Sequence, residues 1–147
     1  MPVLDNRHSQ KGDLYMKYAF PAIFTPETDG GYSVAFPDLE GCYTCGDNLQ
    51  DALEMAEDAL ALTLYGYETN ARDIPKPSAL ADIACKENEF VNYIACDTLA
   101  YRKMYNNKSV KKTLTIPEWL NEAAISMNLN FSQVLQDALT DLVQKEH

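Results

Sequence analysis

The chain has 147 residues, of which 46% are apolar, and its formal net charge is -10. This length suits one domain or a compact domain with a small accessory one, and the apolar content excludes a chain that is disordered throughout. No apolar run is long enough to cross a bilayer, so we expect no membrane partner.

Residues 1–15 are polar and lack the apolar stretch of a signal peptide. We therefore expect a disordered leader on a cytoplasmic protein whose cysteines are reduced. Cys42 and Cys45 form a C-x-x-C pattern, but Cys85 and Cys96 have no matching spacing and no nearby histidine. On a strand, positions 42 and 45 would point to opposite faces, so structural thiols are favoured over a metal or redox site and no cofactor is expected.

Residues 16–101 predict an antiparallel sheet followed by a long helix. Asp29-Gly30-Gly31 is typical of a tight hairpin turn. The predicted strands around and after this turn are residues 17–25, 32–36 and 42–45. A further apolar run at residues 89–101 predicts a fourth strand after the loop "DIPKPSAL".

The predicted helix begins with Asp47 or Asn48 as its N-cap and runs to about Tyr65, ending near Gly66. Its predicted apolar face consists of Leu49, Ala52, Leu53, Ala56, Leu60 and Leu64.

Another face of this helix carries acidic residues at roughly helical spacing, with no Lys or Arg in the helix to offset them. They are Asp47, Asp51, Glu54 and Asp58. Such a face is usually just solvated. The alternative is a docking surface for a basic partner, because complementary potentials speed and select association.

The charge is unevenly distributed along the chain. Residues 1–101 carry a net charge of -11, residues 102–112 carry +5 with no acid, and residues 113–147 carry -4. Residues 102–109 alone indicate a solvated basic linker between two domains. Screening limits the reach of distant charges to about 10 Å, so the acidic body does not exclude a local nucleic-acid contact.

Residues 110–147 predict a strand, a helix and a second helix. From Val110 to Ile116 the pattern alternates, with Leu114 and Ile116 on one face and polar side chains on the other. Those polar side chains are Lys111, Thr113 and Thr115. Pro117 stops the strand and suits the first turn of a helix.

The first of these helices covers residues 118–127, with Asn128 as a left-handed C-cap. Its apolar stripe is Leu120, Ala123, Ala124 and Met127. The second helix has Asn130 as its N-cap and Gln133 at the capping-box position. Its apolar positions are Val134, Leu135, Ala138, Leu139, Leu142 and Val143.

This small unit cannot enclose a core alone. Two copies solve the problem if their strands pair about a two-fold axis above four helices, so we expect a homodimer or a higher even-numbered oligomer. A two-stranded ribbon fits the DNA major groove, and the free amides around Phe131 and Ser132 suit a phosphate. A dimerisation hairpin that binds no DNA is the alternative.

The segment "KKTLTIPEWLNEAAISMNLNFSQVLQDAL" resembles the ribbon-helix-helix DNA-binding fold, the class of the Arc and methionine repressors. By that resemblance the base-reading residues are Lys111, Thr113 and Thr115. The resemblance also implies that Asn130, Phe131 and Ser132 hold a DNA phosphate. Lys112 departs from the pattern, because such families often carry an apolar residue on that inward face.

The segment "YAFPAIFTPETDGGYSVAFPDLEGCYTCGDNLQDALEMAEDAL" resembles HicB-type antitoxins. This resemblance implies an α+β fold with a degenerate RNase-H-like N-terminal domain. It also implies that this domain binds a HicA-type toxin, a small mRNA-cleaving ribonuclease, and that the C-terminal domain binds operator DNA.

Catalysis is not expected. The first predicted strand has no carboxylate, Asp38 and Glu40 lie in a bend, and the two histidines are His8 and His147. Nothing in this pattern assembles a two-magnesium cage or activates a nucleophile. We therefore expect an antitoxin that neutralises its toxin and represses its own operon. An orphan ribbon-helix-helix regulator, whose N-terminal domain only oligomerises or senses another ligand, is the alternative.

Overall fold

The computed structural model describes residues 17–146, so the predicted leader of residues 1–15 lies outside the described range. The chain divides into two compact units, Met1–Asn107 and Lys108–His147, and each is described by itself. No helix between residues 17 and 146 is long and apolar enough to cross a membrane.

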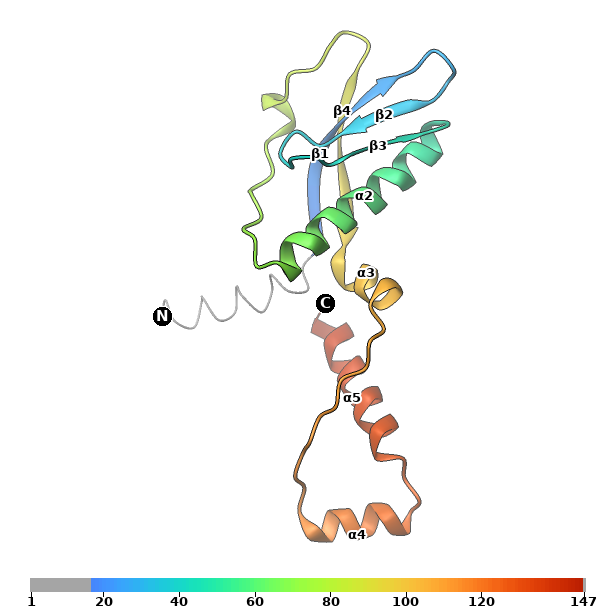
Figure 1. Cartoon of the computed structure of the whole chain (residues 1–147), viewed down its shortest axis with the longest axis vertical. Coiled ribbons are helices and arrows are strands. Elements are labelled where there is room, and N and C mark those ends of the chain that lie inside the picture. The colour runs from blue at the N-terminus through green and yellow to red at the C-terminus, as the bar shows by residue number, and fades with distance from the viewer. Residues whose placement is uncertain (1–16, 147) are drawn as a thin grey trace. The chain divides into compact units, whose positions relative to one another are not determined.

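The first unit is built on an antiparallel sheet with the strand order β3-β2-β1-β4 (Figure 1). The strands are β1 (Lys17–Pro26), β2 (Tyr32–Ala35), β3 (Tyr43–Gly46) and β4 (Phe90–Asp97). Phe24 pairs with Val34 on one side and with Phe90 on the other, which places β1 at the centre. The predicted sheet is confirmed, including the fourth strand, although β3 is displaced by one residue toward Gly46.

The turn between β1 and β2 follows from its glycines. Gly30 has φ of 92°, a left-handed conformation that glycine adopts without a steric penalty. The Gly31 N–H donates to the Asp29 carboxylate at 2.9 Å, and the Glu27 N–H donates to the Gly31 carbonyl at 2.8 Å. These bonds fix the register of the hairpin.

Helix α2 (Leu49–Thr69) begins as expected, because the Asn48 side chain accepts the Asp51 N–H at 2.9 Å. The prediction that it ends near Gly66 is wrong, since the helix continues for another turn to the C-cap Asn70. Gly66 costs up to about 1 kcal/mol inside a helix, but Tyr67 is only 8% exposed and joins the core. Burial of that aromatic ring outweighs the local preference of the glycine.

Helix α2 packs across one face of the sheet, and the core lies between them. Alternate residues of β1 point toward the helix, and Phe20, Ala22 and Phe24 are all fully buried. The helix contributes Ala52, Ala56, Leu60 and Leu64. Near its start the helix approaches β3 closely, because a Cβ atom at Gly46 would clash with the backbone of Ala52.

The segment from Asn70 to Glu89 joins α2 to β4 and contains the short 3-10 helix η1 (Leu80–Asp82). Ser78 donates its N–H and its hydroxyl to the Asp38 carboxylate at 2.8 and 2.6 Å. The Thr25 hydroxyl donates to Glu89 at 2.6 Å. These bonds hold the segment, although it has little regular structure of its own.

The prediction that the fourth strand extends to residue 101 is wrong. The strand stops at Asp97, whose carboxylate accepts the N–H groups of Leu99 and Ala100 at 2.9 and 3.3 Å and so starts helix α3 (Thr98–Tyr105). An aspartate is a preferred helix N-cap, so Asp97 indicates a helix start. The apolar residues of "TLAY" suit a strand equally well, and the prediction followed them. The predicted basic linker, residues 102–109, therefore begins inside a helix.

Glu68, near the end of α2, forms hydrogen bonds that connect α2 with β1 and α3. Its carboxylate accepts the Tyr18 hydroxyl of β1 at 2.9 Å, the Thr98 hydroxyl at 2.9 Å and the Arg102 guanidinium at 2.8 Å. The Glu68 side chain is 2% exposed and that of Arg102 is 22% exposed. A nearly buried charge is tolerated here because it is paired and hydrogen-bonded.

The second unit contains α4 (Glu118–Ser126) and α5 (Phe131–Glu146). Asn128 has φ of 61°, as predicted for a left-handed cap. The Gln133 N–H donates to the Asn130 side chain at 3.1 Å, whereas the Gln133 side-chain amide donates to Asp137 at 2.8 Å and its oxygen does not accept the Asn130 N–H. The N-cap is therefore present, whereas no return bond of a capping box is formed.

Residues 106–117 form neither helix nor strand in the single chain. The strand predicted at 110–116 is thus absent here. The reason is physical: a strand is defined by the backbone bonds to its neighbour, and the neighbour expected for this segment belongs to a second copy.

We predict that Glu68→Ala destabilises the first unit by about 2–3 kcal/mol, because it removes the partner of a largely buried guanidinium. The free energy of unfolding in urea measures this loss. Glu54→Ala, at an exposed position of the same helix, is the matched control and should change stability by about 0.5 kcal/mol or less. Equal effects of the two substitutions would contradict the role assigned to Glu68.

Candidate interaction surfaces

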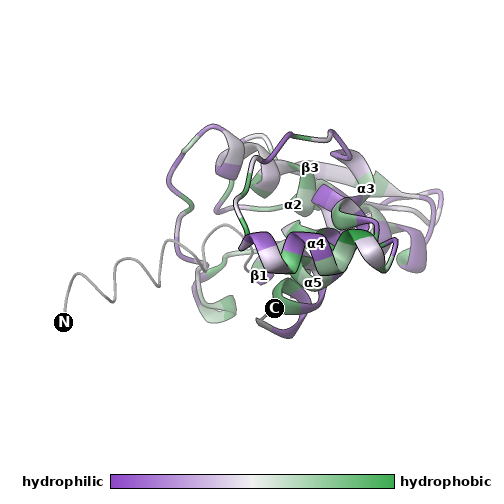
Figure 2. Ribbon diagram, turned by 90° about the horizontal axis from the view of Figure 1, so that it is seen from below, coloured by the Kyte–Doolittle hydropathy of each residue, from purple (hydrophilic) through white to green (hydrophobic). Residues whose placement is uncertain are grey.

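The second unit leaves its apolar side chains in solvent. No residue from 108 to 145 is buried. The exposed large apolar side chains of this unit are Val110, Leu114, Ile116, Trp119, Leu120, Ile125, Met127, Leu129, Phe131, Val134, Leu139, Leu142 and Val143. Figure 2 shows such residues recurring along α4 and α5 between polar ones. An exposed apolar surface of this extent marks an interaction site.

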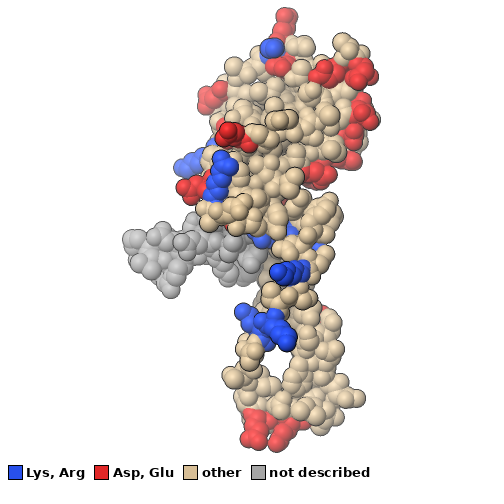
Figure 3. Space-filling view, in the orientation of Figure 1, with Lys and Arg blue, Asp and Glu red and all other residues tan. Residues whose placement is uncertain are grey.

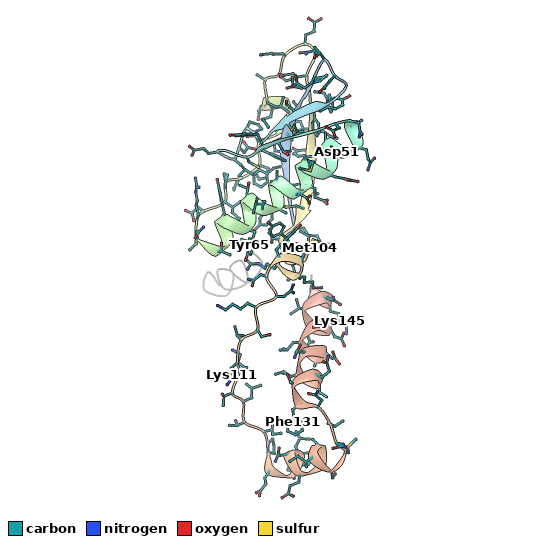
Figure 4. All side chains as sticks on the ribbon, turned by 45° about the vertical axis from the view of Figure 1, so that its right-hand side comes forward. Asp51, Tyr65, Met104, Lys111, Phe131 and Lys145 are labelled. Atoms are coloured by element: carbon teal, nitrogen blue, oxygen red, sulfur yellow. The ribbon has the colours of Figure 1, made fainter. Side chains whose placement is uncertain are left out.

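The predicted base-reading residues lie just before α4. Lys111, Thr113 and Thr115 are all exposed, and Lys111 is labelled in Figure 4. Leu114 and Ile116, predicted to face inward, are 59% and 46% exposed. In the single chain the polar and the apolar side chains of this segment are therefore all exposed, and no buried face is formed.

The predicted phosphate-binding residues lie together at the start of α5, where Phe131 is labelled in Figure 4. Asn130 uses its side-chain oxygen as the N-cap, and the Ser132 hydroxyl accepts from the Gln136 amide at 3.1 Å. Phe131 is 42% exposed. The backbone amides of this first turn give the helix end a partial positive charge.

The predicted acidic surface lies on α2. Asp51, Glu54 and Asp58 share one side of the helix, and Asp47 directly precedes its N-cap. The Asp51 carboxylate also accepts the Asp47 N–H at 2.8 Å, so one of these acids stabilises the helix end. Figure 3 shows carboxylates gathered on the side of the first unit where the N-terminal half of α2 lies.

Two apolar side chains within this acidic surface were not anticipated from the sequence. Met55 is 39% exposed and Leu62 is 57% exposed. Both lie outside the apolar stripe that packs on the sheet. This position in the helical pattern could have identified them from the sequence as exposed apolar residues.

Three tyrosines join α3 to α2. The rings of Tyr65 and Tyr101 lie 5.3 Å apart and those of Tyr101 and Tyr105 lie 4.5 Å apart. The Arg102 guanidinium lies 4.8 Å from the Tyr65 ring centre. Desolvation, followed by the neighbouring Tyr105 and Tyr65, raises the pKa of Tyr101. The cluster holds α3 against the C-terminal half of α2.

The cysteines do not form a common site. Cys42 and Cys96 are buried, while Cys45 and Cys85 are exposed. Between residues 17 and 146, no group of three or more His, Cys, Asp or Glu side chains is placed to hold a metal ion. Burial raises the pKa of the Cys42 thiol and, together with the nearby Glu57, Asp97 and Glu68 carboxylates, raises that of Cys96 to about 12.

A shallow cavity of about 500 Å³ lies on strands β1 to β3. Its lining residues are Thr25, Ser33, Val34, Ala35, Tyr43, Thr44 and Cys45. This lining includes no carboxylate and no imidazole, and its only ionisable side chains are those of Tyr43 and Cys45.

Comparison with known proteins identifies a matching family model and a similar solved structure. A family model described as the HicB-like antitoxin of bacterial toxin–antitoxin systems matches residues 20–138, which include parts of both units. A solved toxin–antitoxin complex from Streptococcus pneumoniae contains a chain that is 29% identical, with a TM-score of 0.57. That similarity covers 86% of this chain and 99% of the other.

Two curated relatives match over shorter stretches. Antitoxin HicB 1 of Photorhabdus laumondii is 41% identical over 58 residues, which cover 40% of this chain and 37% of the relative. Antitoxin HicB of Escherichia coli K12 is 38% identical over 61 residues, which cover 42% of this chain and 44% of the relative. The chain thus spans less than half the length of either.

We predict that iodoacetamide at pH 8 labels Cys45 and Cys85 in the folded protein and leaves Cys42 and Cys96 unlabelled until urea is added. Peptide mass spectrometry measures the labelling of each thiol. Labelling of Cys96 in native protein at the rate of Cys45 would contradict its burial.

Because the pKa of Cys96 is raised, we predict that the free energy of unfolding depends on pH in the alkaline range. Between pH 9 and about 12 the unfolded thiol loses its proton while the folded one keeps it, so the folded state binds more protons and stability falls as pH rises. The Cys96→Ala variant should lose less stability than the parent over that interval in urea titrations. Identical pH profiles would count against this assignment.

Proposed function

The chain belongs to the HicB-like antitoxin family, and from this we propose that it binds and neutralises a HicA-type mRNA-cleaving toxin and represses its own operon by binding operator DNA. The observation that carries the proposal is the extent of the family match. It runs from residue 20 to residue 138 and so includes both the sheet unit and most of the C-terminal helices.

The first unit is the toxin-binding part in this proposal. A protein that cleaves mRNA needs a basic surface to bind a polyanion, and an acidic protein of complementary potential can cover that surface. Residues 1–101 carry a net charge of -11, and α2 contains no Lys or Arg. The chain therefore acts by occupying the RNA-binding surface rather than by any chemistry of its own.

The second unit is the DNA-binding part. Burial of Leu114 and Ile116 between two copies would turn Lys111, Thr113 and Thr115 outward on a shared ribbon. Lysine and threonine side chains on such a ribbon can contact base edges in the major groove. The exposure of all five side chains in the single chain is consistent with this pairing.

The start of α5 completes the DNA contact. Asn130, Phe131 and Ser132 place a helix N-terminus where its amides can bind a backbone phosphate on each side of the ribbon. Phosphate contacts set the orientation and the threonine and lysine contacts set the sequence preference. Repression follows when the complex occupies the operator of its own operon.

Co-expression with the neighbouring reading frame tests the proposal. A small basic protein should copurify with the tagged chain, and the growth arrest and mRNA cleavage that this protein causes alone should be relieved. If no such protein associates and cleavage continues, the antitoxin function is wrong. Retention of operator binding in that case would instead favour an orphan transcription regulator.

We predict that Lys111→Ala and Thr113→Ala each weaken operator binding by about 5- to 150-fold, the effect of losing one base contact. Electrophoretic mobility shift at fixed salt measures the affinity. Lys108→Ala, in the same basic segment but outside the predicted ribbon, is the matched control and should weaken binding of all DNA sequences alike.

Both variants should still bind the toxin as tightly as the parent. Loss of both activities together would indicate unfolding, and undiminished operator binding would contradict the base-reading role.

A further inference from the structure

The solvent side of α2 carries a regular stripe. Asp51, Met55, Asp58 and Leu62 follow one another at alternating steps of four and three residues. Residues at this spacing lie on one side of a helix, and the same spacing forms the seam when two helices pack at a shallow angle. The stripe therefore has the geometry of a helix-binding face, although the sheet occupies the opposite side.

The apolar members of the stripe stand in solvent. Met55 and Leu62 are 39% and 57% exposed and lie two helical turns apart. Single exposed apolar residues are common and need no explanation. Two of them in register, alternating with Asp51 and Asp58 and with Glu54 beside them, form an amphipathic pattern that is complementary to another amphipathic helix.

The platform beneath the stripe is rigid. On the side facing the sheet, Ala52, Ala56, Leu60 and Leu64 are buried, and Asn48 caps the first turn. The stripe is therefore fixed in position before any partner arrives, which lowers the entropic cost of binding. Asp51 marks the N-terminal end of the stripe in Figure 4, and Tyr65, which packs against Tyr101 of α3, lies beyond its C-terminal end.

We propose that this stripe, Asp51, Met55, Asp58 and Leu62, is the docking site for a basic amphipathic helix of the toxin. Apolar residues of that helix pack between Met55 and Leu62, and its Lys or Arg residues pair with Asp51, Glu54 and Asp58. This inference rests on the proposed antitoxin function, and it specifies the structural element of the partner and the residues that receive it.

The charge of the stripe decides between occupants. A second copy of the chain would bring Asp51 and Asp58 against the same carboxylates, and like charges across an interface disfavour association. DNA and RNA are excluded for the same reason, because their phosphates are anionic. A basic helix satisfies both the carboxylates and the exposed apolar side chains.

The test measures toxin affinity with variants of the full-length chain. Met55→Lys/Leu62→Lys replaces both anchors with charges that repel a basic helix, and both positions are exposed, so the fold should be retained. We expect affinity for the copurified toxin to fall at least about 30-fold, as for the loss of central interface contacts. Isothermal titration calorimetry gives the affinity, and circular dichroism confirms the fold.

Two further variants make the result decisive. Tyr43→Lys, at a residue that is 72% exposed on strand β3, is the matched control and should bind the toxin within about threefold of the parent. Met55→Gln/Leu62→Gln removes the apolar contacts without adding charge and should weaken binding by about tenfold.

The outcomes separate the inference from the function. If the parent binds the toxin and both double variants bind it equally well, the docking site is wrong while the antitoxin function stands. If the parent binds no toxin, both are wrong. Weakened binding by both double variants with normal binding by Tyr43→Lys supports the inference.

Discussion

The C-terminal unit depends on a core that one chain cannot supply. Its two helices and the segment before them bury no residue from 108 to 145, yet they present Leu114, Ile116, Leu139 and Leu142 to water. Burying such side chains contributes about 1.5–3 kcal/mol each, so association is the available source of stability. In the proposed function, pairing of two copies would at the same time form the ribbon and turn its polar side chains outward, so DNA binding would follow from assembly.

In the proposed function, the two units carry out two different electrostatic tasks within one chain. The first unit concentrates carboxylates on α2 and is suited to a basic protein, whereas the lysines before α4 are suited to a polyanion. Since screening limits each field to about 10 Å, the opposed charges can act independently when they lie far enough apart. Glu68 keeps the end of the first unit ordered by holding Arg102, a cation that sequence alone assigned to the linker.

Sequence reasoning succeeded where local rules and packing agree. The hairpin signal Asp29-Gly30-Gly31 predicted the turn between β1 and β2, and the cap at Asn48 predicted the start of α2. It failed where a distant contact overrides a local preference, as when burial of Tyr67 carries α2 past Gly66. The periodicity of the buried stripe does not predict the exposed pair Met55 and Leu62, because both residues lie outside the face that packs on the sheet.

Assembly of the C-terminal unit is tested most directly by sedimentation equilibrium of the full-length chain at micromolar concentration. We expect a dimer or a higher even-numbered species, and we expect Leu139→Glu/Leu142→Glu to shift it toward monomer and to abolish operator binding at the same time. A single-copy species in which hydrogen exchange still protects α4 and α5 would contradict it, because those helices would then be stable without a partner.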